Sequence, residues 1–406
     1  MSDLPKKFCM APFVHMYVHS NESERVCCMT TEDIEEGDVV RPNEELDLTK
    51  RWNGKHLKNI RRQFLNNKEP EICIKCFSHE RAGGISDRIR FNEMYGDDIT
   101  PNVLTGNQYG SPIDLDIRPG NLCNLGCRMC GPVSSSTIQK ELKNNKSMQR
   151  IMGKGDIVTT DVLKDTENLK FLLKNADKGR RIKFLGGEPT IMPEVDEFLD
   201  ILIERDMLNV PLHFTTNCTN GNKRFIDKIS KFTEVSFNYS VDGTEKIVEY
   251  IRHPVKFNSI NKNIRTYHSL ASHGEISFTL QAYNFFNLVD SIKWSSALDI
   301  SLRPEILMYP DPLSYKSIPL KIRRKRIPLM IKMIEDIPLS GSISRTQVKQ
   351  RALPALERIY EDKEEYSQQH LARHTKIIDK VRKQHVKDYV PEVWDFIKEE
   401  YNAIQI

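Results

Sequence analysis

Short apolar runs alternate with amphipathic stretches over the middle of the chain. The runs are four to nine residues long and contain β-branched or aromatic residues, a pattern typical of buried strands. They are Ile113–Ile117, Ile182–Leu185, Leu212–Thr216, Val235–Ser240, Ile276–Leu280 and Ile300–Met308. Because strands that alternate with helices form parallel βα units, the pattern predicts an α/β fold with six parallel strands.

Helical patterns occupy the segments between these runs and both flanks. Those between the runs are Val162–Asn175, Val195–Arg205, Phe225–Phe232 and Ile260–Ser272. A further helix is predicted over Gly54–Leu65, a linker over Thr100–Pro112, and mostly helical structure after Pro310, with an amphipathic stretch at Asp379–Tyr401. We therefore expect three parts: a cysteine-rich unit (1–105), the βα region (106–310) and a helical C-terminal extension (311–406).

Composition and charge narrow the class of protein only a little. Apolar residues make up 39% of the 406 residues, enough for a sizeable core, and the charged residues nearly cancel to a formal net charge of +4. No apolar run approaches the roughly 18 residues of a membrane-spanning helix, and the N-terminal residues lack the apolar region of a signal peptide. We expect a cytoplasmic protein with no membrane partner. The basic segment Lys321–Arg326 is expected to be a solvated helix face, with binding of a nucleic acid as the less favoured alternative.

The nine cysteines are more informative, because eight of them gather in two groups. Cys123, Cys127 and Cys130 closely follow the first predicted strand. Three thiolates at this spacing can wrap one face of an iron–sulfur cube, each binding one iron, and no fourth cysteine lies nearby in the sequence. One iron is then open to a further ligand, which allows chemistry besides electron transfer; a zinc site is the alternative. Cys218 stands alone and is expected to be a small buried residue.

The segment Cys123–Cys130 resembles the Cys-x3-Cys-x2-Cys motif of the radical S-adenosylmethionine (SAM) superfamily. A second match follows the next predicted strand, where Gly186-Gly187-Glu188-Pro189 resembles the segment that positions the amino group of SAM in that superfamily. The two glycines allow close approach of a ligand, the proline restricts the turn, and the glutamate adds a carboxylate that suits an ammonium group. One departure is Met129, which stands where the family usually has an aromatic residue and is a soft, apolar replacement for it.

The same resemblance assigns roles to further residues at the strand ends. Ser240 and Asp242 match the strand end that contacts the ribose and carboxylate of SAM in the family, and Asn217 is a weaker match. Arg252 is a candidate for contact with the SAM carboxylate, and Asn284 is a candidate for a residue that faces the mouth of the barrel. Without the resemblance, Ser240 and Asp242 would be interpreted as a turn. The fold that the family implies is a partial, open parallel (β/α)6 barrel, whose sites collect at the carboxyl ends of the strands.

The second group of cysteines lies near the N-terminus. It contains five cysteines, one more than the four ligands of a metal centre: Cys9, Cys27, Cys28, Cys73 and Cys76. This pattern resembles the Twitch unit, a shortened SPASM domain that holds one auxiliary [4Fe–4S] cluster, although that unit usually follows the barrel and here precedes it. The resemblance implies a second cluster in this chain. Structural zinc is the alternative, and spacing alone does not choose between Cys27 and Cys28.

The resemblance to the radical SAM superfamily implies reductive cleavage of SAM by the first [4Fe–4S] cluster, fed by an external electron donor of the flavodoxin or ferredoxin type. The 5′-deoxyadenosyl radical then abstracts a hydrogen atom from the substrate. We favour oxidative modification of a peptide or protein side chain, with dehydrogenation of a small polar metabolite second. A non-catalytic iron–sulfur electron carrier or redox sensor is the alternative of another class. The Gly186–Pro189 segment counts against it, because a carrier needs no SAM pocket.

Overall fold

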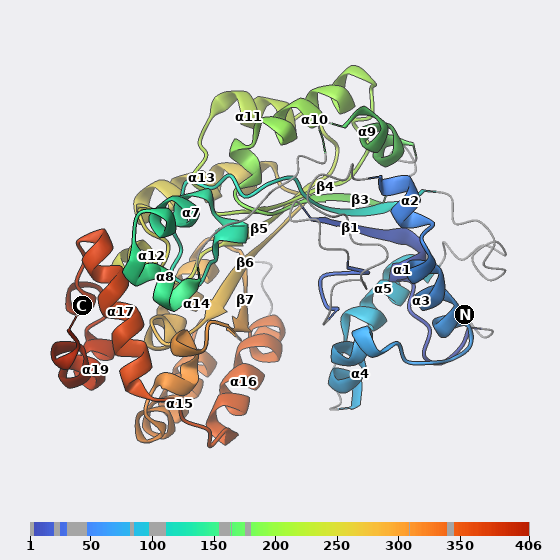
Figure 1. The fold of residues 1–406 in the computed structure, drawn as a ribbon. Helices are drawn as coiled ribbons and strands as arrows, with labels where there is room; N and C mark the ends of the chain where they lie inside the picture. Colours follow the sequence, from blue (N-terminus) through green and yellow to red (C-terminus); the bar gives the residue numbers. More distant parts are fainter. Residues whose placement is uncertain are drawn as a thin grey trace. The chain divides into compact units, whose positions relative to one another are not determined.

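The chain is divided into two compact units in the computed structural model (Figure 1). Unit 1 comprises Met1–Asn121, Val158–Phe214 and Arg224–Val235, and unit 2 comprises Leu122–Ile157, Thr215–Lys223 and Ser236–Ile406. The residues that the structure describes are 4–19, 25–30, 47–81, 85–96, 111–153, 163, 165–174, 180–307, 309–338 and 345–405. Most of the predicted linker Thr100–Pro112 lies outside these residues.

Unit 1 contains a parallel sheet in which neighbouring strands follow one another in the sequence. Its strands are β1 (His15–His19), β2 (Asp114–Arg118), β3 (Arg181–Phe184) and β4 (Leu212–Thr216, of which Leu212–Phe214 belong to this unit). The sequence predicts β2, β3 and β4 but not β1. His15–His19 consists of Met16, Tyr17 and Val18 between two histidines, and it lies in the cysteine-rich N-terminal region, whereas the alternation of apolar runs with helical patterns that predicts the other strands begins at Ile113.

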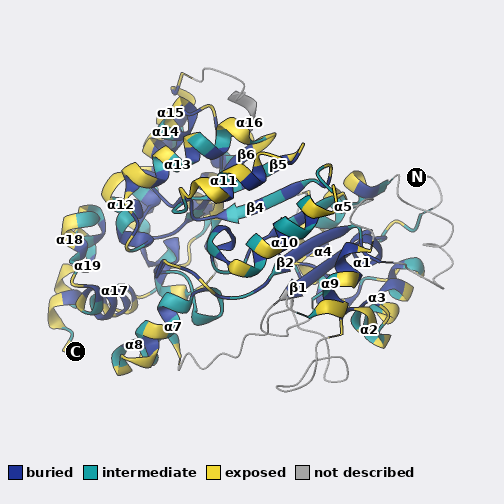
Figure 2. Cartoon of the chain, turned by 90° about the horizontal axis from the view of Figure 1, so that it is seen from above, coloured by how far each residue is buried: buried dark blue, intermediate teal, exposed yellow. Residues whose placement is uncertain are grey.

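Aromatic side chains on β3 and β4 pack against helices. Phe184 and Phe214 stack at 5.4 Å between ring centroids, Phe198 meets Phe184 edge-on at 5.5 Å, and Phe225 meets Phe214 in the same way at 5.5 Å. Because successive side chains of a strand point to opposite faces, these contacts place the apolar face of the sheet toward the helices. Figure 2 shows β1 and β2 in the colour of buried residues, with exposed residues on the outer sides of the helices.

The helices of unit 1 agree with the predicted ones where a prediction was made. They are α1 (Ala11–Val14), α2 (Leu48–Trp52), α3 (Lys55–Leu65), α4 (Ile74–Arg81), α5 (Asp87–Tyr95), α9 (Thr166–Leu173), α10 (Pro193–Glu204) and α11 (Lys223–Ile229). The predicted Gly54–Leu65, Val195–Arg205 and Phe225–Phe232 correspond to α3, α10 and α11. The predicted Val162–Asn175 is shortened to α9, and some of its terminal residues lie outside the described part of the chain.

Unit 2 contains three parallel strands and most of the C-terminal half. β5 (Val235–Ser240) pairs with β6 (His273–Leu280), which pairs with β7 (Ser301–Ile306). Its helices are α7 (Ser136–Lys143), α8 (Lys146–Met152), α12 (Glu245–Ile251), α13 (Phe257–Leu270), α14 (Leu288–Ala297), α15 (Leu320–Glu335), α16 (Arg345–Glu361), α17 (Gln368–Arg382), α18 (Val386–Tyr389) and α19 (Pro391–Ala403). Among the described residues, none of the helices has the length and apolar character to cross a membrane.

After Pro310 the described residues are mostly helical, but Asp379–Tyr401 is not one helix. α17 ends at Arg382, because Lys383 has a left-handed backbone with φ of 53° and terminates the helix. Pro391 then starts α19 at a position where proline is favoured.

A buried ionic cluster joins the first three strands of unit 1. Asp114 accepts from His15 Nδ1 at 2.7 Å and from Arg181 Nε at 2.8 Å, and both His15 and Asp114 are buried. Burial alone would raise the pKa of Asp114, but His15 and Arg181 outweigh it and hold that pKa well below its usual value. The ionised carboxylate is therefore part of the folded unit.

Replacing this carboxylate tests the cluster. We expect Asp114→Asn to cost about 3–5 kcal/mol at pH 7, since the guanidinium of Arg181 loses its charged partner. The folded pKa is depressed, so the stabilisation is complete above the unfolded pKa of about 3.9 and is lost as the pH falls below it. Urea unfolding at pH 7, 5 and 3 should show the difference from wild type shrinking toward pH 3.

The matched control is Glu167→Gln, which removes an exposed ion pair with Lys170 in the same unit. It should change the stability by less than about 0.5 kcal/mol at every pH. A difference between wild type and Asp114→Asn that does not vary with pH would contradict the assignment of an ionised, stabilising Asp114.

Candidate functional site

The three-cysteine loop belongs to unit 2, where Cys123 and Cys127 are buried and Cys130 is partly buried. Its backbone is pinned to the end of α12: Gly126 N donates to His253 O at 2.7 Å, and Arg128 N donates to Ile251 O at 2.8 Å. These bonds fix the shape of the loop before any ligand is bound.

Two side chains from other segments point donors at the sulfur atoms. Asn217 Nδ2 lies 3.8 Å from Cys123 Sγ, and Arg252 Nη1 lies 3.8 Å from Cys127 Sγ. The hydrogen bond from Cys130, with a further contribution from the Arg252 charge, lowers the pKa of Cys127 against the opposing effect of burial. Because the thiolate is the form that binds metal, this environment suits a metal-ligating cysteine.

Arg252, which the sequence analysis assigned to a ligand carboxylate, is bonded to a carboxylate of the protein itself. Arg252 Nε donates to Asp242 Oδ2 at 2.7 Å, and Asp242 Oδ1 accepts from Thr279 N at 2.7 Å. Asp242 is fully buried, and its backbone oxygen accepts from Asn284 Nδ2 at 3.2 Å. Asp242 therefore orients Arg252 toward Cys127, and both of its carboxylate oxygens already accept a hydrogen bond. Ser240 ends β5 two residues earlier and is partly buried.

The Gly186–Pro189 segment lies in unit 1 and follows β3, as predicted. Gly186 has a φ of 118°, and a Cβ atom there would lie 2.8 Å from Gly120 O, so the position requires glycine. Gly187 N donates to Gly120 O at 3.2 Å. Gly120 is three residues before Cys123 in the sequence, so the two glycines pack against the segment that leads into the cysteine loop.

Glu188 in this segment is fully buried, and its carboxylate points back toward the turn that follows it in the chain. Its Oε1 accepts from Thr190 Oγ1 at 2.6 Å and from Thr190 N at 3.2 Å. The carboxylate therefore caps the short helical turn Pro189–Ile191.

The N-terminal cysteines come together in a separate site within unit 1. Four of them line one cavity: Cys9, Cys27, Cys73 and Cys76. Cys28 does not line this cavity and is exposed. Of the two neighbouring cysteines, Cys27 thus shares the cavity with Cys9, Cys73 and Cys76, and Cys28 does not.

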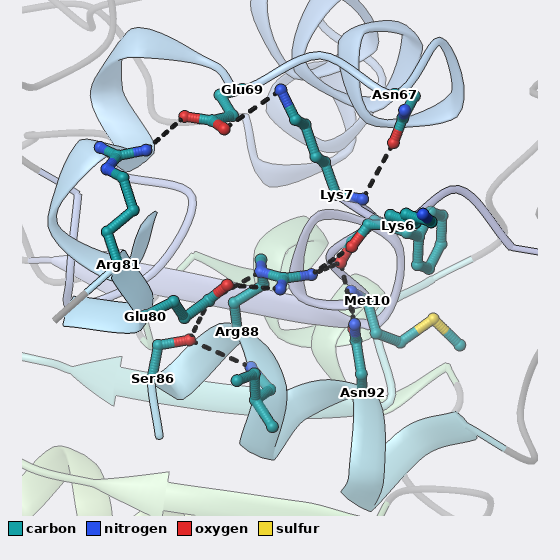
Figure 3. Close-up of polar contacts among 12 residues, drawn as sticks. Lys6, Lys7, Met10, Asn67, Glu69, Glu80, Arg81, Ser86, Arg88 and Asn92 are labelled. Atoms are coloured by element: carbon teal, nitrogen blue, oxygen red, sulfur yellow. Dashed lines mark hydrogen bonds and ion pairs between the residues drawn. The ribbon is translucent and has the colours of Figure 1, made fainter. Parts of the chain in front are cut away.

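One arginine ties the two cysteine-bearing segments of this cavity together (Figure 3). Arg88 on α5 donates to Phe8 O at 2.6 Å, next to Cys9, and to Glu80 at 2.6 and 2.8 Å, on the helix that carries Cys76. Asn92, one turn further along α5, accepts from Met10 N and donates to Phe8 O, both at 2.8 Å. The backbone on both sides of Cys9 is therefore held by α5.

Within the described residues, no group of three or more His, Cys, Asp or Glu side chains is arranged so that it could hold a metal ion. A zinc ion needs its thiolates about 2.3 Å from one point. A [4Fe–4S] cluster binds each thiolate at a different iron, so its ligands surround a larger volume. The two kinds of centre therefore make different demands on the four thiols that line the cavity of unit 1.

Arg128, which lies between the second and third cysteines of the loop, is a buried anchor that the sequence did not reveal. Its Nη2 donates to Asp379 Oδ1 of α17 at 2.6 Å, and its Nε donates to Tyr250 O at 3.0 Å. Both Arg128 and Asp379 are buried, and the guanidinium lies 3.5 Å from the centre of the Tyr250 ring. The partners are 251 positions apart, and no spacing pattern connects them.

A second contact from α17 reaches the same loop. Arg382 is held by Glu141 at 2.8 and 3.0 Å and lies where a side chain on Gly126 would stand, with 2.8 Å between Arg382 Nη2 and a Cβ at Gly126. The cysteine loop is thus supported by a helix of the C-terminal extension at two points.

Neutralising Asp379 tests this support. We expect Asp379→Asn to cost about 3–5 kcal/mol, because the buried Arg128 loses its counter-charge. The loosened loop should let iodoacetamide reach Cys127 faster in metal-free protein, measured by mass spectrometry of the peptide. Asp388→Asn, an exposed residue on α18, is the control and should leave both quantities unchanged. Equal labelling rates for the two variants would show that Asp379 does not hold the loop.

Comparison with known proteins gives the following matches. Residues 117–280, less than half of the chain, match the family described as Radical SAM superfamily. No curated protein matches the chain. Among solved structures, SuiB of Streptococcus suis bound to precursor peptide SuiA is 16% identical, with a TM-score of 0.37 and coverage of 64% of this chain and 57% of that chain. Native anSMEcpe with bound AdoMet and Cp18Cys peptide is 17% identical, with a TM-score of 0.37 and coverage of 54% and 59%.

A further similar structure is TYW1 with a lysine–pyruvate adduct bound, which is 14% identical, with a TM-score of 0.33 and coverage of 57% of this chain and 76% of that chain. The chain spans less than two thirds of the length of the first two structures. The matched residues 117–280 include the three-cysteine loop, the Gly186–Pro189 segment and the residues around Arg252. Over residues 117–280, this chain is therefore similar to the Radical SAM superfamily.

Proposed function

We propose that this protein is a radical SAM enzyme with two [4Fe–4S] clusters. The observation that carries the proposal is the three-cysteine loop of the radical SAM domain, in which the Arg252 guanidinium and the Asn217 amide face two of the sulfur atoms. The chemistry that the cofactors supply when bound is one-electron reductive cleavage of SAM, followed by hydrogen-atom abstraction from a substrate.

The residues of the loop have distinct tasks in this proposal. Cys123, Cys127 and Cys130 hold the SAM-binding cluster as thiolates and leave one iron for SAM. Arg252, oriented by Asp242, stabilises negative charge on Cys127. In this proposal Cys127 and Cys130 bind metal, and residues outside their loop hold the loop in position.

The SAM contacts remain assignments by resemblance. They comprise Gly186, Gly187, Glu188 and Pro189 for the amino group, and Asn217, Ser240, Asp242 and Arg252 for the ribose and carboxylate. Since the Asp242 carboxylate already binds Arg252 and Thr279, we assign its part to orientation rather than to direct contact. Gly186 and Gly187 offer backbone without side chains at the turn after β3, which allows close approach of a ligand.

For the second cluster we propose Cys9, Cys27, Cys73 and Cys76 as the four ligands. The support is their shared cavity, together with Arg88, which holds the segments of Cys9 and Cys76 in place. Burial raises the pKa of Cys73 to about 12 in the metal-free chain, so metal binding must displace protons from these thiols. With four protein ligands, an electron-transfer role is favoured over direct binding of substrate.

The substrate we propose is a peptide or protein side chain that is oxidatively modified, with a small polar metabolite as the second candidate. This rests on the resemblance of the N-terminal cysteine pattern to Twitch units, whose enzymes act on these two kinds of substrate. The external reductant is a one-electron carrier of the flavodoxin or ferredoxin type.

The first test is the iron and sulfide content after anaerobic reconstitution. We expect about eight irons for wild type and about four for a Cys123→Ala/Cys127→Ala/Cys130→Ala variant, because each cluster holds four irons. With SAM and dithionite, wild type should release 5′-deoxyadenosine and the variant should not. Full iron loading without 5′-deoxyadenosine under any reductant would replace the enzyme proposal with the electron carrier.

The ligand set of the second cluster has its own test. Cys27→Ser should reduce the iron content to about four, whereas Cys28→Ser, one residue away, should retain about eight. The zinc content is measured on the same samples. Loss of iron in Cys28→Ser but not in Cys27→Ser would reverse the assignment, and zinc in place of iron in wild type would make the site structural.

A further inference from the structure

Three helices of unit 2 that pack on one another form a surface of one charge. α8 packs against both α7 and α17. Every charged side chain that is exposed on these three helices is basic: Lys140, Lys143, Lys146, Arg150, Arg373 and Lys380. The acidic residues of the same helices are turned inward, where Glu141 pairs with Arg382 and Asp379 with Arg128.

A hollow in this surface is lined by two arginines and a histidine from two of the helices. Arg150 comes from α8, and His370 and Arg373 come from α17. Among the residues that the structure describes, no acidic side chain lines the hollow. The neighbouring α19 carries exposed Asp395 and Glu399, but neither lines it. The same helices can be followed in Figures 1 and 2, where α8 lies beside α7 and α17.

This surface is connected to the cysteine loop by direct packing. Cys130 lies against an apolar cluster made by Ile138 of α7, Met148 of α8 and Ile377 of α17, together with Leu142. Ile377 also lines the basic hollow. Ile377 therefore belongs both to the apolar cluster that Cys130 packs against and to the lining of the hollow.

We propose that the surface formed by α7, α8 and α17 is the docking site of the acidic one-electron carrier protein that reduces the SAM-binding cluster. The proposal rests on the proposed function, since SAM cleavage consumes one electron per turnover. In the step assigned to this surface, the carrier is oxidised by one electron and the cluster is reduced by one. No bond forms or breaks and no proton is transferred.

The positive charge of the surface indicates the charge of the partner protein that it would bind. A single-sign patch accelerates the association of an oppositely charged protein, and the effect weakens as salt screens it. Six exposed cations and no exposed carboxylate on these helices favour an acidic partner. A nucleic acid would also complement the positive charge. Its binding, however, would gain nothing from a surface that packs against a proposed cluster ligand.

The experiment reverses the charge at two residues of the hollow. Reconstituted full-length Arg150→Glu/Arg373→Glu is compared with wild type for 5′-deoxyadenosine formation, driven either by a reduced acidic flavodoxin or by dithionite. We expect the KM for flavodoxin to rise by about tenfold or more at low salt. The dithionite-driven rate should be unchanged, because a small reductant needs no docking site. For wild type, the KM for flavodoxin should rise with ionic strength.

The matched control is Lys321→Glu/Lys325→Glu on α15, which changes the net charge by the same amount at exposed residues of another basic helix. It should leave the KM for flavodoxin near the wild-type value. If both double variants raise the KM equally, the effect belongs to net charge and the docking site is wrong.

The remaining outcomes are also decisive. If Arg150→Glu/Arg373→Glu also loses dithionite-driven activity, the neutral pair Arg150→Gln/Arg373→Gln is measured, and a KM equal to wild type overturns the proposal. If the charge reversal instead abolishes RNA retention in a mobility assay with the KM for flavodoxin unchanged, the surface binds nucleic acid. Absence of 5′-deoxyadenosine from wild type with dithionite would reject the proposed function itself, a result distinct from a failure at this surface.

Discussion

The buried ion pair between Arg128 and Asp379 is the interaction on which the three-cysteine loop depends. Burying both charges costs several kcal/mol, and this cost is offset only when nearly every polar atom finds a partner. Here the carboxylate accepts from Arg128, from Tyr250 Oη at 2.8 Å, from Val386 N at 2.9 Å and from Tyr401 Oη at 3.1 Å. The network thus joins the loop to α12, α17, α18 and α19.

A consequence is that the C-terminal extension has a role beyond covering a hydrophobic face. Helix α17 supplies Asp379 and Arg382 to the cysteine loop, and its Ile377 packs in the cluster that Cys130 contacts. The loop also buries Leu125, so these contacts add to apolar packing. Charged and directional contacts provide the precision that metal ligands require.

The N-terminal site follows the same physical rule with different residues. Arg88 joins the Cys9 segment to the helix that carries Cys76 through one guanidinium, which offers several donors in a fixed plane. In both sites an arginine bonded to a carboxylate holds a cysteine-bearing segment: Arg128 bonds to Asp379, and Arg88 bonds to Glu80. The two sites differ in the number and placement of their thiols: one has three thiols in a single loop, and the other has four around a cavity.

The sequence by itself determined the features that depend on local order. The apolar runs predicted six of the strands, because short segments that contain β-branched and aromatic residues favour buried strands. The spacing of Cys123, Cys127 and Cys130 predicted a metal-binding loop, and Gly186 and Gly187 predicted a turn that a ligand can approach closely. Only the tertiary structure decided what depends on distant pairs: strand β1, the cavity that Cys27 and not Cys28 shares with the other cysteines, and the bond between Asp379 and Arg128. Such pairs are separated by tens to hundreds of residues, and no periodicity along the chain records which side chains the fold brings together.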